Sequence, residues 1–525
     1  MKIISSLLFV SVFFTACLVE EPVQSESGGG DTLVAAESAS STAPTVEVAP
    51  LRPVEAAPLP TAEPVEFSVV VYNLENVFDV DGVAMFDDYQ QDEADDPFTY
   101  TRRKFLTKLE NAATVLETLE AGGPDVILFQ EFEGDFTPER TVGDFGAFLD
   151  EHEETTAARM LTDGWSEDYR SIPSYAWLLK VMHDRGLRGY NVAVAPNKPL
   201  ESGIAHVNAT FSRFPIREVN YHEIPQARDI IEARIEVGGH AVWLYNNHWK
   251  SGASNPEREP IRVENARALH RLVQARLAAD PMADVIIGGD LNSHYNHSIL
   301  FPTIQTGIND VLGSHYLEGE RLYNLWYEIA PEDRYTEVWR GKRGTLMHFI
   351  LAPGLYDDRG VSYIDGSFRV GIFEGLNANA LRRPLDWSFA GSTGGGASDH
   401  FPLLARFRTG GFEAESPLNR VNDALEYEMR HDADPTIFPE NLPNAASLNQ
   451  YTAGRSGELV GRVYAARVTV LRVSPLILEL DGREWPAYAP APAASEQMIE
   501  GAKLDLIVSF GHWRGEAQLV VEAVR

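Results

Sequence analysis

The stretch IIGGDLNSHYNH, from Ile286 to His297, joins a short apolar run to two glycines, after which an aspartate and an asparagine stand two positions apart. An apolar run that ends in glycine is typical of a buried strand that breaks into a loop. Asp290 and Asn292 then lie at the carboxyl end of that strand and can point into one cleft. The stretch therefore predicts a sheet with functional polar side chains at one edge.

Similar runs recur along the chain and predict the fold class. Strands are expected in FSVVVYNLEN, DVILFQE, AVWLYNNHW, TLMHFIL and FPLLARF, and the segment RRKFLTKLENAATVLETLE has the apolar spacing of a helix. Strands interleaved with helices favour an α+β fold of two packed β-sheets flanked by helices, a four-layer α/β/β/α sandwich. We expect residues 67–408 to form this domain.

The rest of the 525-residue chain divides by composition. Residues 18–66 are rich in Pro, Ala, Glu and Ser and predict a disordered tether. Residues 409–456 predict a linker with one helix, LNRVNDALEYEMR. Residues 457–525 contain strand-like runs with glycine turns, which predict a small all-β domain that resembles an OB-fold. Its Trp485, Tyr488 and Trp513 are candidates for stacking on bases, with packing inside the domain as the alternative.

The first 17 residues have the pattern of an export signal. Met1 and Lys2 give a positive start, an apolar region runs from Ile3 to Phe14, and Cys17 is the one cysteine of the chain. This resembles a bacterial lipoprotein signal peptide and lipobox, which implies lipidation of Cys17 and a location in the cell envelope, anchored to the membrane and facing the periplasm or the exterior. Phe14 replaces the usual Leu, so simple secretion is the alternative. A lone cysteine excludes an intrachain disulfide.

The formal net charge of -33 limits the classes of partner. It argues against a protein that coats nucleic acid through a basic surface. It does not exclude a nuclease with a local metal site, because bound cations offset the charge of both protein and phosphate.

Polar side chains follow or precede several of the predicted strands. Carboxylate and amide oxygens suit a hard cation such as Mg²⁺, and histidines beside carboxylates suit acid–base work and phosphate contact. The sequence contains no HExxH, P-loop or GxSxG pattern. Taken singly, each residue has an ordinary alternative, such as a turn asparagine or a structural histidine. The residues are Asn73, Glu75, Glu131, His248, Asp290, Asn292, Asp399 and His400.

Together, six motifs in order resemble the endonuclease/exonuclease/phosphatase family, the family of deoxyribonuclease I and exonuclease III. They are YNLENVFD, PDVILFQEFE, FSRFPI, NNHWKSG, GGDLNS and SDHFPL, spread through residues 67–408. The resemblance implies a divalent metal, Mg²⁺ with Mn²⁺ and Ca²⁺ as alternatives, and in-line attack of water on phosphorus. The metal ligands it implies are Asn73, Glu131 and Asp399.

The resemblance also implies the roles of the remaining residues. Asp290 would orient or deprotonate the attacking water, Asn292 and His248 would contact the phosphate, and His400 would stabilise the developing charge. For Arg228, the sequence leaves a structural role and a phosphate-binding role both open.

One position departs from the family pattern. TLMHFIL places Met347 where the family usually has an aspartate that pairs with the catalytic histidine. Either another acid supports His400, or the enzyme is slowed.

The resulting hypothesis is a metal-dependent phosphodiester hydrolase, an extracytoplasmic endonuclease or exonuclease acting on DNA or RNA. The alternatives are a phosphatase or phospholipid phosphodiesterase of the same superfamily, and a degenerate, non-catalytic lipoprotein binding module. No sequence feature indicates a protein partner.

Overall fold

The computed structural model describes residues 64–90, 97–137, 142–314, 322–414, 439 and 441–525. The predicted signal peptide, most of the predicted tether and the predicted helix of the linker lie outside these residues. Among the described helices, none has the length and apolar character that a membrane span requires.

The first sheet has seven strands, and its central strands come from the two ends of the domain. Strand β1 pairs in parallel with β2 and antiparallel with β15, so the first and last strands of the domain lie side by side. The order is β13 (Val361–Tyr363), β15 (Leu403–Thr409), β1 (Glu66–Val77), β2 (Val126–Glu133), β4 (His206–Ser212) and β3 (Asn191–Val194), with β14 (Arg369–Val370) also on β15.

The second sheet has six strands, and its centre is again a parallel pair, β7 and β8. A two-stranded hairpin of β10 (Glu337–Trp339) and β11 (Lys342–Gly344) precedes β12 in the chain. The order of the sheet is β5 (Ile216–His222), β6 (Ile230–Val237), β7 (His240–His248), β8 (Asp284–Asp290), β12 (Met347–Leu351) and β9 (Tyr323–Asn324).

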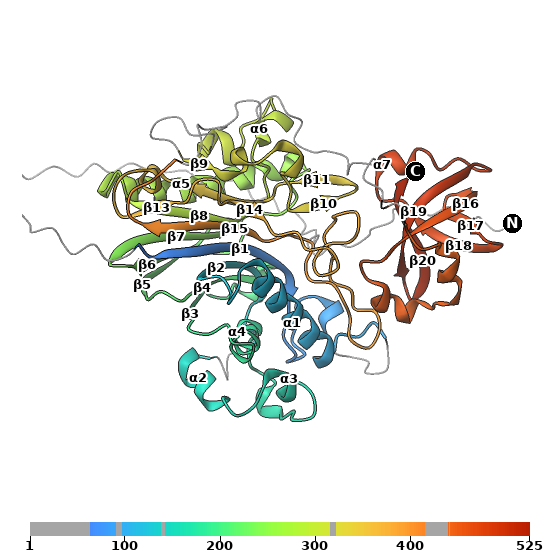
Figure 1. Ribbon diagram of the computed structural model, residues 1–525, viewed down its shortest axis with the longest axis horizontal. Coiled ribbons are helices and arrows are strands. Elements are labelled where there is room, and N and C mark those ends of the chain that lie inside the picture. The colour runs from blue at the N-terminus through green and yellow to red at the C-terminus, as the bar shows by residue number, and fades with distance from the viewer. Residues whose placement is uncertain (1–63, 91–96, 138–141, 315–321, 415–438, 440) are drawn as a thin grey trace, which may run out of the picture. The chain divides into compact units, whose positions relative to one another are not determined.

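The two sheets pack face to face, and helices cover their outer faces (Figure 1). Helices α1 (Arg102–Leu119) and α4 (Ser174–Asp184) lie on the first sheet, and α5 (Glu259–Ala279) buries Leu269 and Val273 against the second. Between them in the chain come α2 (Phe145–Glu151) and α3 (Ala157–Met160), while α6 (His297–Leu300) follows β8. The predicted α+β fold of two packed sheets flanked by helices is confirmed.

Close packing between the two sheets explains why the opening stretch has a glycine at position 288. A Cβ atom at this position of β8 would lie 2.7 Å from Leu128 Cδ1 and Val71 Cγ2 of the first sheet. The glycine therefore lets the two sheets approach closely. Beside it, Asn246 of β7 donates to Ala209 O at 2.9 Å and accepts from Gln130 Nε2 at 2.8 Å, so polar contacts also join the sheets.

The C-terminal residues form a closed five-stranded barrel. Its order is β16 (Val463–Val473), β17 (Leu476–Leu480), β18 (Arg483–Tyr488), β20 (Glu516–Val524) and β19 (Lys503–Trp513), with α7 (Pro492–Ser495) between β18 and β19. This barrel is consistent with the OB-like prediction. Trp485 is fully buried in its core, so packing explains this residue, whereas Trp513 is partly exposed.

Candidate active site

The predicted site residues gather where four central strands end. Asn73 lies on β1 and Glu131 on β2, which run in parallel in the first sheet. His248 ends β7, and Asp290 ends β8, and the two are register partners in the second sheet. Because the sheets are packed face to face, carboxyl ends from both sheets meet at one edge of the sandwich.

Asn73 joins the two halves of the site. Its Nδ2 donates to Glu131 Oε1 and to Asp290 Oδ2, each at 3.1 Å. The second oxygen of Glu131, Oε2, accepts from the backbone N–H of Asn76 at 3.0 Å. One buried amide thus fixes a carboxylate from each sheet, and the orientation of Glu131 is set at both of its oxygens.

The backbone around these side chains is unusual. Glu75, Asn76, Glu131 and Asn292 all have positive φ angles, between 47° and 69°. Such angles are uncommon outside glycine, and they tend to cluster at functional sites. Gly289 has φ 135°, and a Cβ there would lie 2.0 Å from Asn247 O, so this position also requires glycine.

Two histidines flank Asp290. The Nε2 atoms of His248 and His400 each lie 3.8 Å from Asp290 Oδ2. His400 Nε2 is also 3.8 Å from Asp399 Oδ1, and His248 Nε2 is 3.8 Å from Glu131 Oε1. The loop before β15 therefore brings Asp399 and His400 to the same place as the ends of β2, β7 and β8.

Burial and neighbouring charges give the two histidines opposite protonation states. Burial lowers the pKa of His248 well below its usual value, and the positive charge of Arg228 lowers it further. Burial also disfavours the charged form of His400, but the carboxylates of Asp399 and Asp290 outweigh it and raise its pKa to about 9. At neutral pH the site then holds one neutral and one charged imidazole.

The carboxyl groups of the site also differ in the direction in which their pKa values are shifted. Burial raises the pKa of Asp290 and of Asp399. Burial alone would raise the pKa of Glu131, but its electrostatic interactions with His206 and Arg228 and the hydrogen bond from Asn73 outweigh burial and lower that pKa. Glu131 is therefore ionised at neutral pH, while Asp290 has the higher proton affinity that a general base needs.

The hydrogen-bond partners of Asn292 and Arg228 were not predicted from the sequence. The backbone N–H of Asn292 donates to Asp290 Oδ1 at 2.8 Å, and its side chain donates to Trp249 O at 3.2 Å. Arg228 is buried, its Nη2 lies 2.9 Å from His206 Nδ1, and its charge acts on Glu131. Arg228 thus contacts His206 and acts on Glu131 through its charge.

The chemistry of the side-chain donors decides which metal ion the site could hold. Among the residues that the structure describes, no three His, Cys, Asp or Glu side chains are gathered in a metal-ligand arrangement. The donors nevertheless suit a hard cation, because the ionised Glu131 and the buried Asp290 are both oxygen donors fixed by Asn73. Asp399 adds a third carboxylate beside His400. The residues fit Mg²⁺ better than a soft metal.

Two buried charged residues near the site were not predicted. Lys108 of α1 is fully buried, its Nζ lies 5.0 Å from the Trp387 ring, and its charge acts on Glu75 and Asp399. A signal for it existed, since it lies on the apolar face of the helix with Phe105. Glu337 of β10 is the other: it is buried, and its charge acts on His400. No motif surrounds it.

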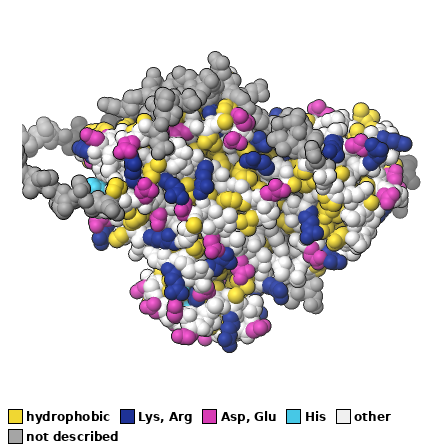
Figure 2. All heavy atoms as spheres, in the orientation of Figure 1, with side chains coloured by type: hydrophobic (Ala, Val, Ile, Leu, Met, Phe, Trp, Pro, Cys, Tyr) yellow, Lys and Arg dark blue, Asp and Glu magenta, His cyan; other side chains and the backbone are white. Residues whose placement is uncertain are grey.

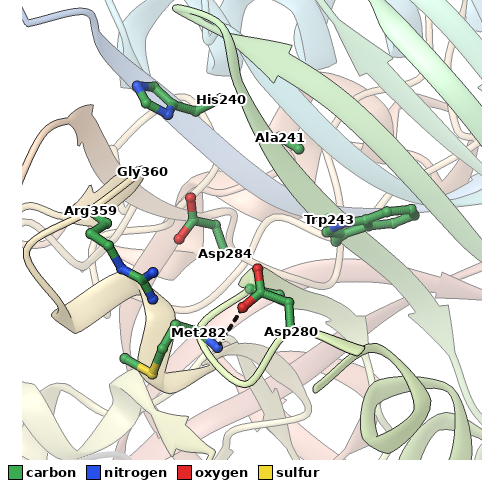
Figure 3. A pocket seen from close by; sticks show the side chains of 9 residues that line it. His240, Ala241, Trp243, Asp280, Met282, Asp284, Arg359 and Gly360 are labelled. Atoms are coloured by element: carbon green, nitrogen blue, oxygen red, sulfur yellow. Dashed lines mark hydrogen bonds between the residues drawn. The ribbon is translucent and has the colours of Figure 1, made fainter. Parts of the chain in front are cut away.

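A pocket of roughly 230 Å³ lies at the other end of β7 and β8 (Figure 3). His240, Trp243 and Asp284 line it, with Arg359 across from Asp284. His240 and Asp284 begin the strands that His248 and Asp290 end. The pocket is therefore separate from the candidate site.

Comparisons with known proteins agree with the sequence motifs. Residues 207–409 match the model of the Endonuclease/Exonuclease/phosphatase family. No curated protein matches the chain.

Several solved structures are similar to it at low identity. Truncated Caenorhabditis elegans TDP2 is 16% identical, with 65% of this chain and 97% of that chain covered and a TM-score of 0.35. D. rerio TDP2 complexed with a single-strand DNA product is 12% identical, with 66% and 99% covered and a TM-score of 0.34. An endonuclease/exonuclease/phosphatase family protein from Bacteroides thetaiotaomicron is 14% identical, with 68% and 99% covered and a TM-score of 0.37. These values are too low to carry an inference about activity.

Proposed function

We propose that this chain is a divalent-metal-dependent phosphodiester hydrolase that cleaves nucleic acid. One observation carries the proposal. Asp290 Oδ2 accepts from Asn73 Nδ2 at 3.1 Å and lies 3.8 Å from the Nε2 atoms of both His248 and His400. A carboxylate with raised proton affinity, beside one neutral and one charged imidazole, suits attack of water on a phosphodiester.

Each residue then has a role that follows from its state. Asp290 orients the attacking water and takes its proton. His400, charged at neutral pH, stabilises the negative charge that develops on the phosphate, and the neutral His248 donates a hydrogen bond to it. Asn292 gives one amide proton to Trp249 O and has a second for a phosphate oxygen.

The metal would be held by Glu131, with Asn73 and Asp399. When bound, a divalent cation adds positive charge beside the phosphate and polarises its oxygens. Because Asn73 and Asn76 fix the two oxygens of Glu131, this ligand is presented in a single orientation. Preorganisation of this kind lowers the reorganisation needed during reaction.

The proposed substrate is DNA or RNA, recognised locally rather than through a charged surface. The net charge is -33, and Figure 2 shows acidic and basic side chains intermixed on the face in view. Binding to a polyanion would then depend on the metal and on the positive charge of His400, not on a broad basic patch.

We also propose that the protein is exported and anchored by lipid at Cys17. The support is the signal-like start of the chain and the position of its one cysteine. The hydrolase would then act in the cell envelope.

The test is a hydrolysis assay on the full chain. Single-stranded and double-stranded DNA, RNA and a phosphomonoester are each incubated with Mg²⁺, Mn²⁺ or Ca²⁺ and with a chelator. We expect cleavage of nucleic acid that the chelator abolishes and added metal restores. Cleavage of the monoester alone would assign the site to a phosphatase instead, and hydrolysis of neither would refute the proposal.

A matched pair of variants locates the activity. His248→Ala should lose it, while His240→Ala, at the exposed beginning of the same strand, should keep it. Equal activity in the two variants would mean that hydrolysis occurs elsewhere.

A further inference from the structure

Two of the nine tryptophans of the chain are exposed, and both stand at the tip of a hairpin with the sequence Trp-Arg-Gly. Trp339 ends β10 and is 48% exposed, and Trp513 ends β19 and is 36% exposed. A single exposed aromatic side chain needs no functional explanation by itself. The charges around each ring therefore decide whether either tip is a binding site.

The two hairpins have the same two-residue turn. Arg340 and Gly341 have φ angles of 50° and 76°, and the corresponding residues of the barrel have 49° and 77°. Positive φ at both central positions is the type I′ geometry, which usually takes Asn-Gly. In each hairpin the guanidinium lies over the preceding indole, 5.6 Å from the ring centroid at Trp339 and 5.3 Å at Trp513. Both turns thus present an indole with a cation beside it.

The neighbouring charges differ between the two tips. Trp339 lies opposite Lys342 in the register of its hairpin, whereas Trp513 lies opposite Glu516. Residues 338–346 carry three positive charges and no acid. The tip of the β10–β11 hairpin therefore combines an exposed indole with a local cluster of cations, in a chain whose net charge is -33.

The base of the β10–β11 hairpin is bound to the candidate active site. Thr336 O accepts from the backbone N–H of Phe401 at 2.7 Å, and Leu346 O accepts from that of Leu291 at 2.9 Å. Phe401 and Leu291 directly follow the histidine and the aspartate that we propose to be catalytic. The hairpin thus starts at the proposed catalytic residues and presents Trp339 at its far end.

The length of β11 limits the distance between the tip and the site. Lys342 stands four residues before Leu346. An extended chain rises about 3.3 Å per residue, so these two residues are at most about 13 Å apart. A strand with stacked bases covers that length with roughly four nucleotides, at about 3.4 Å each. A nucleic acid with its scissile phosphate in the site can therefore reach Trp339.

We propose that the β10–β11 hairpin is a docking site for single-stranded nucleic acid, with a base stacked on Trp339 and nearby phosphates bound by Arg340 and Lys342. The inference rests on the proposed function, because it names the form of nucleic acid that the same site takes. Stacking on an aromatic side chain needs the face of an unpaired base and tolerates any sequence. The cations add a local attraction for the phosphates.

A membrane surface with anionic lipids attracts the same types of side chain, but the hairpin fits it less well. Stable binding to such a surface needs a large buried apolar area. Within residues 337–346, Trp339 is the one exposed apolar side chain, since Val338 and Leu346 are partly buried. The attachment of the hairpin to the candidate site also favours the substrate of that site over a lipid.

The first experiment measures binding in the absence of hydrolysis. The full chain carrying His400→Ala is titrated, with Mg²⁺ present, against a fluorescent single strand of roughly 12 nucleotides and against the corresponding duplex. Adding Trp339→Ala should raise the Kd for the single strand by about 5–100-fold and change the Kd for the duplex much less. Trp339→Phe should keep part of the affinity. Trp513→Ala, in the same turn without the cation cluster, is the matched control and should bind normally.

The second experiment tests the charges through salt dependence. Each phosphate contact that is lost should reduce the slope of log Kd against log salt concentration by about 0.7 for a single strand. Arg340→Gln should show this reduction, and Arg514→Gln, at the same position of the barrel turn, should not. Equal slopes in wild type and Arg340→Gln would overturn the proposed phosphate contact.

The outcomes separate this proposal from the hydrolase itself. An unchanged Kd in a Trp339→Ala protein that melts like its parent, while wild type hydrolyses nucleic acid, would overturn the docking site and leave the hydrolase standing. Equal weakening for single strand and duplex, or by Trp513→Ala, would also overturn it. Trp339-dependent binding in a chain that hydrolyses nothing would support the docking site and refute the hydrolase.

Vesicles of phosphatidylglycerol and phosphatidylcholine test the membrane alternative. Binding to these vesicles should be the same for the full chain with and without Trp339→Ala. If the variant loses binding to vesicles and keeps its affinity for the single strand, the hairpin is a lipid-binding element and the proposal is overturned.

Discussion

Gly344→Ala tests the packing around Glu337 without changing any charge. The new methyl group would begin 1.8 Å from Glu337 Oε1 and 2.9 Å from its Cδ. Ordinary contact between carbon and oxygen is about 3.3 Å, so the oxygen must retreat by roughly 1.5 Å. The φ angle at Gly344 is not in the left-handed region, and alanine therefore strains the site only through this contact.

The expected size of the effect follows from the contacts that are lost. Moving the carboxylate that far would break the hydrogen bonds that Oε2 accepts from Thr336 and Leu346. Hydrogen bonds to a charged group contribute about 1.5–3 kcal/mol each, and partial relaxation should reduce the total to about 2–4 kcal/mol.

The assay is thermal unfolding. Combining Gly344→Ala with Glu337→Gln should lower the melting temperature by less than the sum of the two single changes, because both act on the same carboxylate. Gly143→Ala is the control, since a Cβ there meets nothing within 4 Å. A Gly344→Ala protein with the wild-type melting temperature would show that Glu337 is not fixed by these hydrogen bonds.

Three further predictions concern the site, the far pocket and the export signal. Asp290→Ala and His400→Ala should each remove most hydrolysis and keep the fold; near-wild-type turnover at matched metal would contradict the mechanism. Burial raises the pKa of Asp284 from 3.8 to about 7. A carboxyl group whose pKa is raised by folding contributes stability that is fully present below its pKa in the unfolded chain. That stability is lost as the pH rises through its pKa in the folded protein. The Asp284→Asn protein should therefore be more stable than wild type at pH 8, by at least about 1 kcal/mol, and no more stable at pH 4. Equal unfolding curves for the two proteins at both pH values would contradict this prediction. Cys17→Ser should move the protein from membrane to soluble fractions, and unchanged fractionation would contradict lipidation.

The fold was predictable where the chain repeats a strong pattern. The apolar runs that become β1, β2, β7, β8 and β15 alternate with the helical spacing of α1, and this pattern is what distinguishes an α+β sandwich. Strands β9 and β14 have only two residues each, which is too short for any period to appear. The pairing of β1 with β15 joins opposite ends of the domain, and nothing local in either strand indicates it.

The grouping of the candidate site residues was predictable to the extent that they stand at strand ends. Asp290 and His248 follow buried runs, and sheet geometry then brings them together. Glu337 could not be predicted in this way, because EVWRGKRG has neither an apolar period nor a motif, and its position depends on tertiary hydrogen bonds. The contact of Arg228 with His206 likewise depends on tertiary structure.

Asn73 bridges the two sheets, so we expect activity to appear only late in folding. Glu131 comes from one sheet and Asp290 from the other, and a single amide joins them. Neither sheet alone contains the complete set of proposed reacting groups, so we expect a partly folded chain or a proteolytic fragment with one sheet to be inert. Hydrolysis would then be a reporter of the final docking step, and two separately expressed halves would become active only on reassociation.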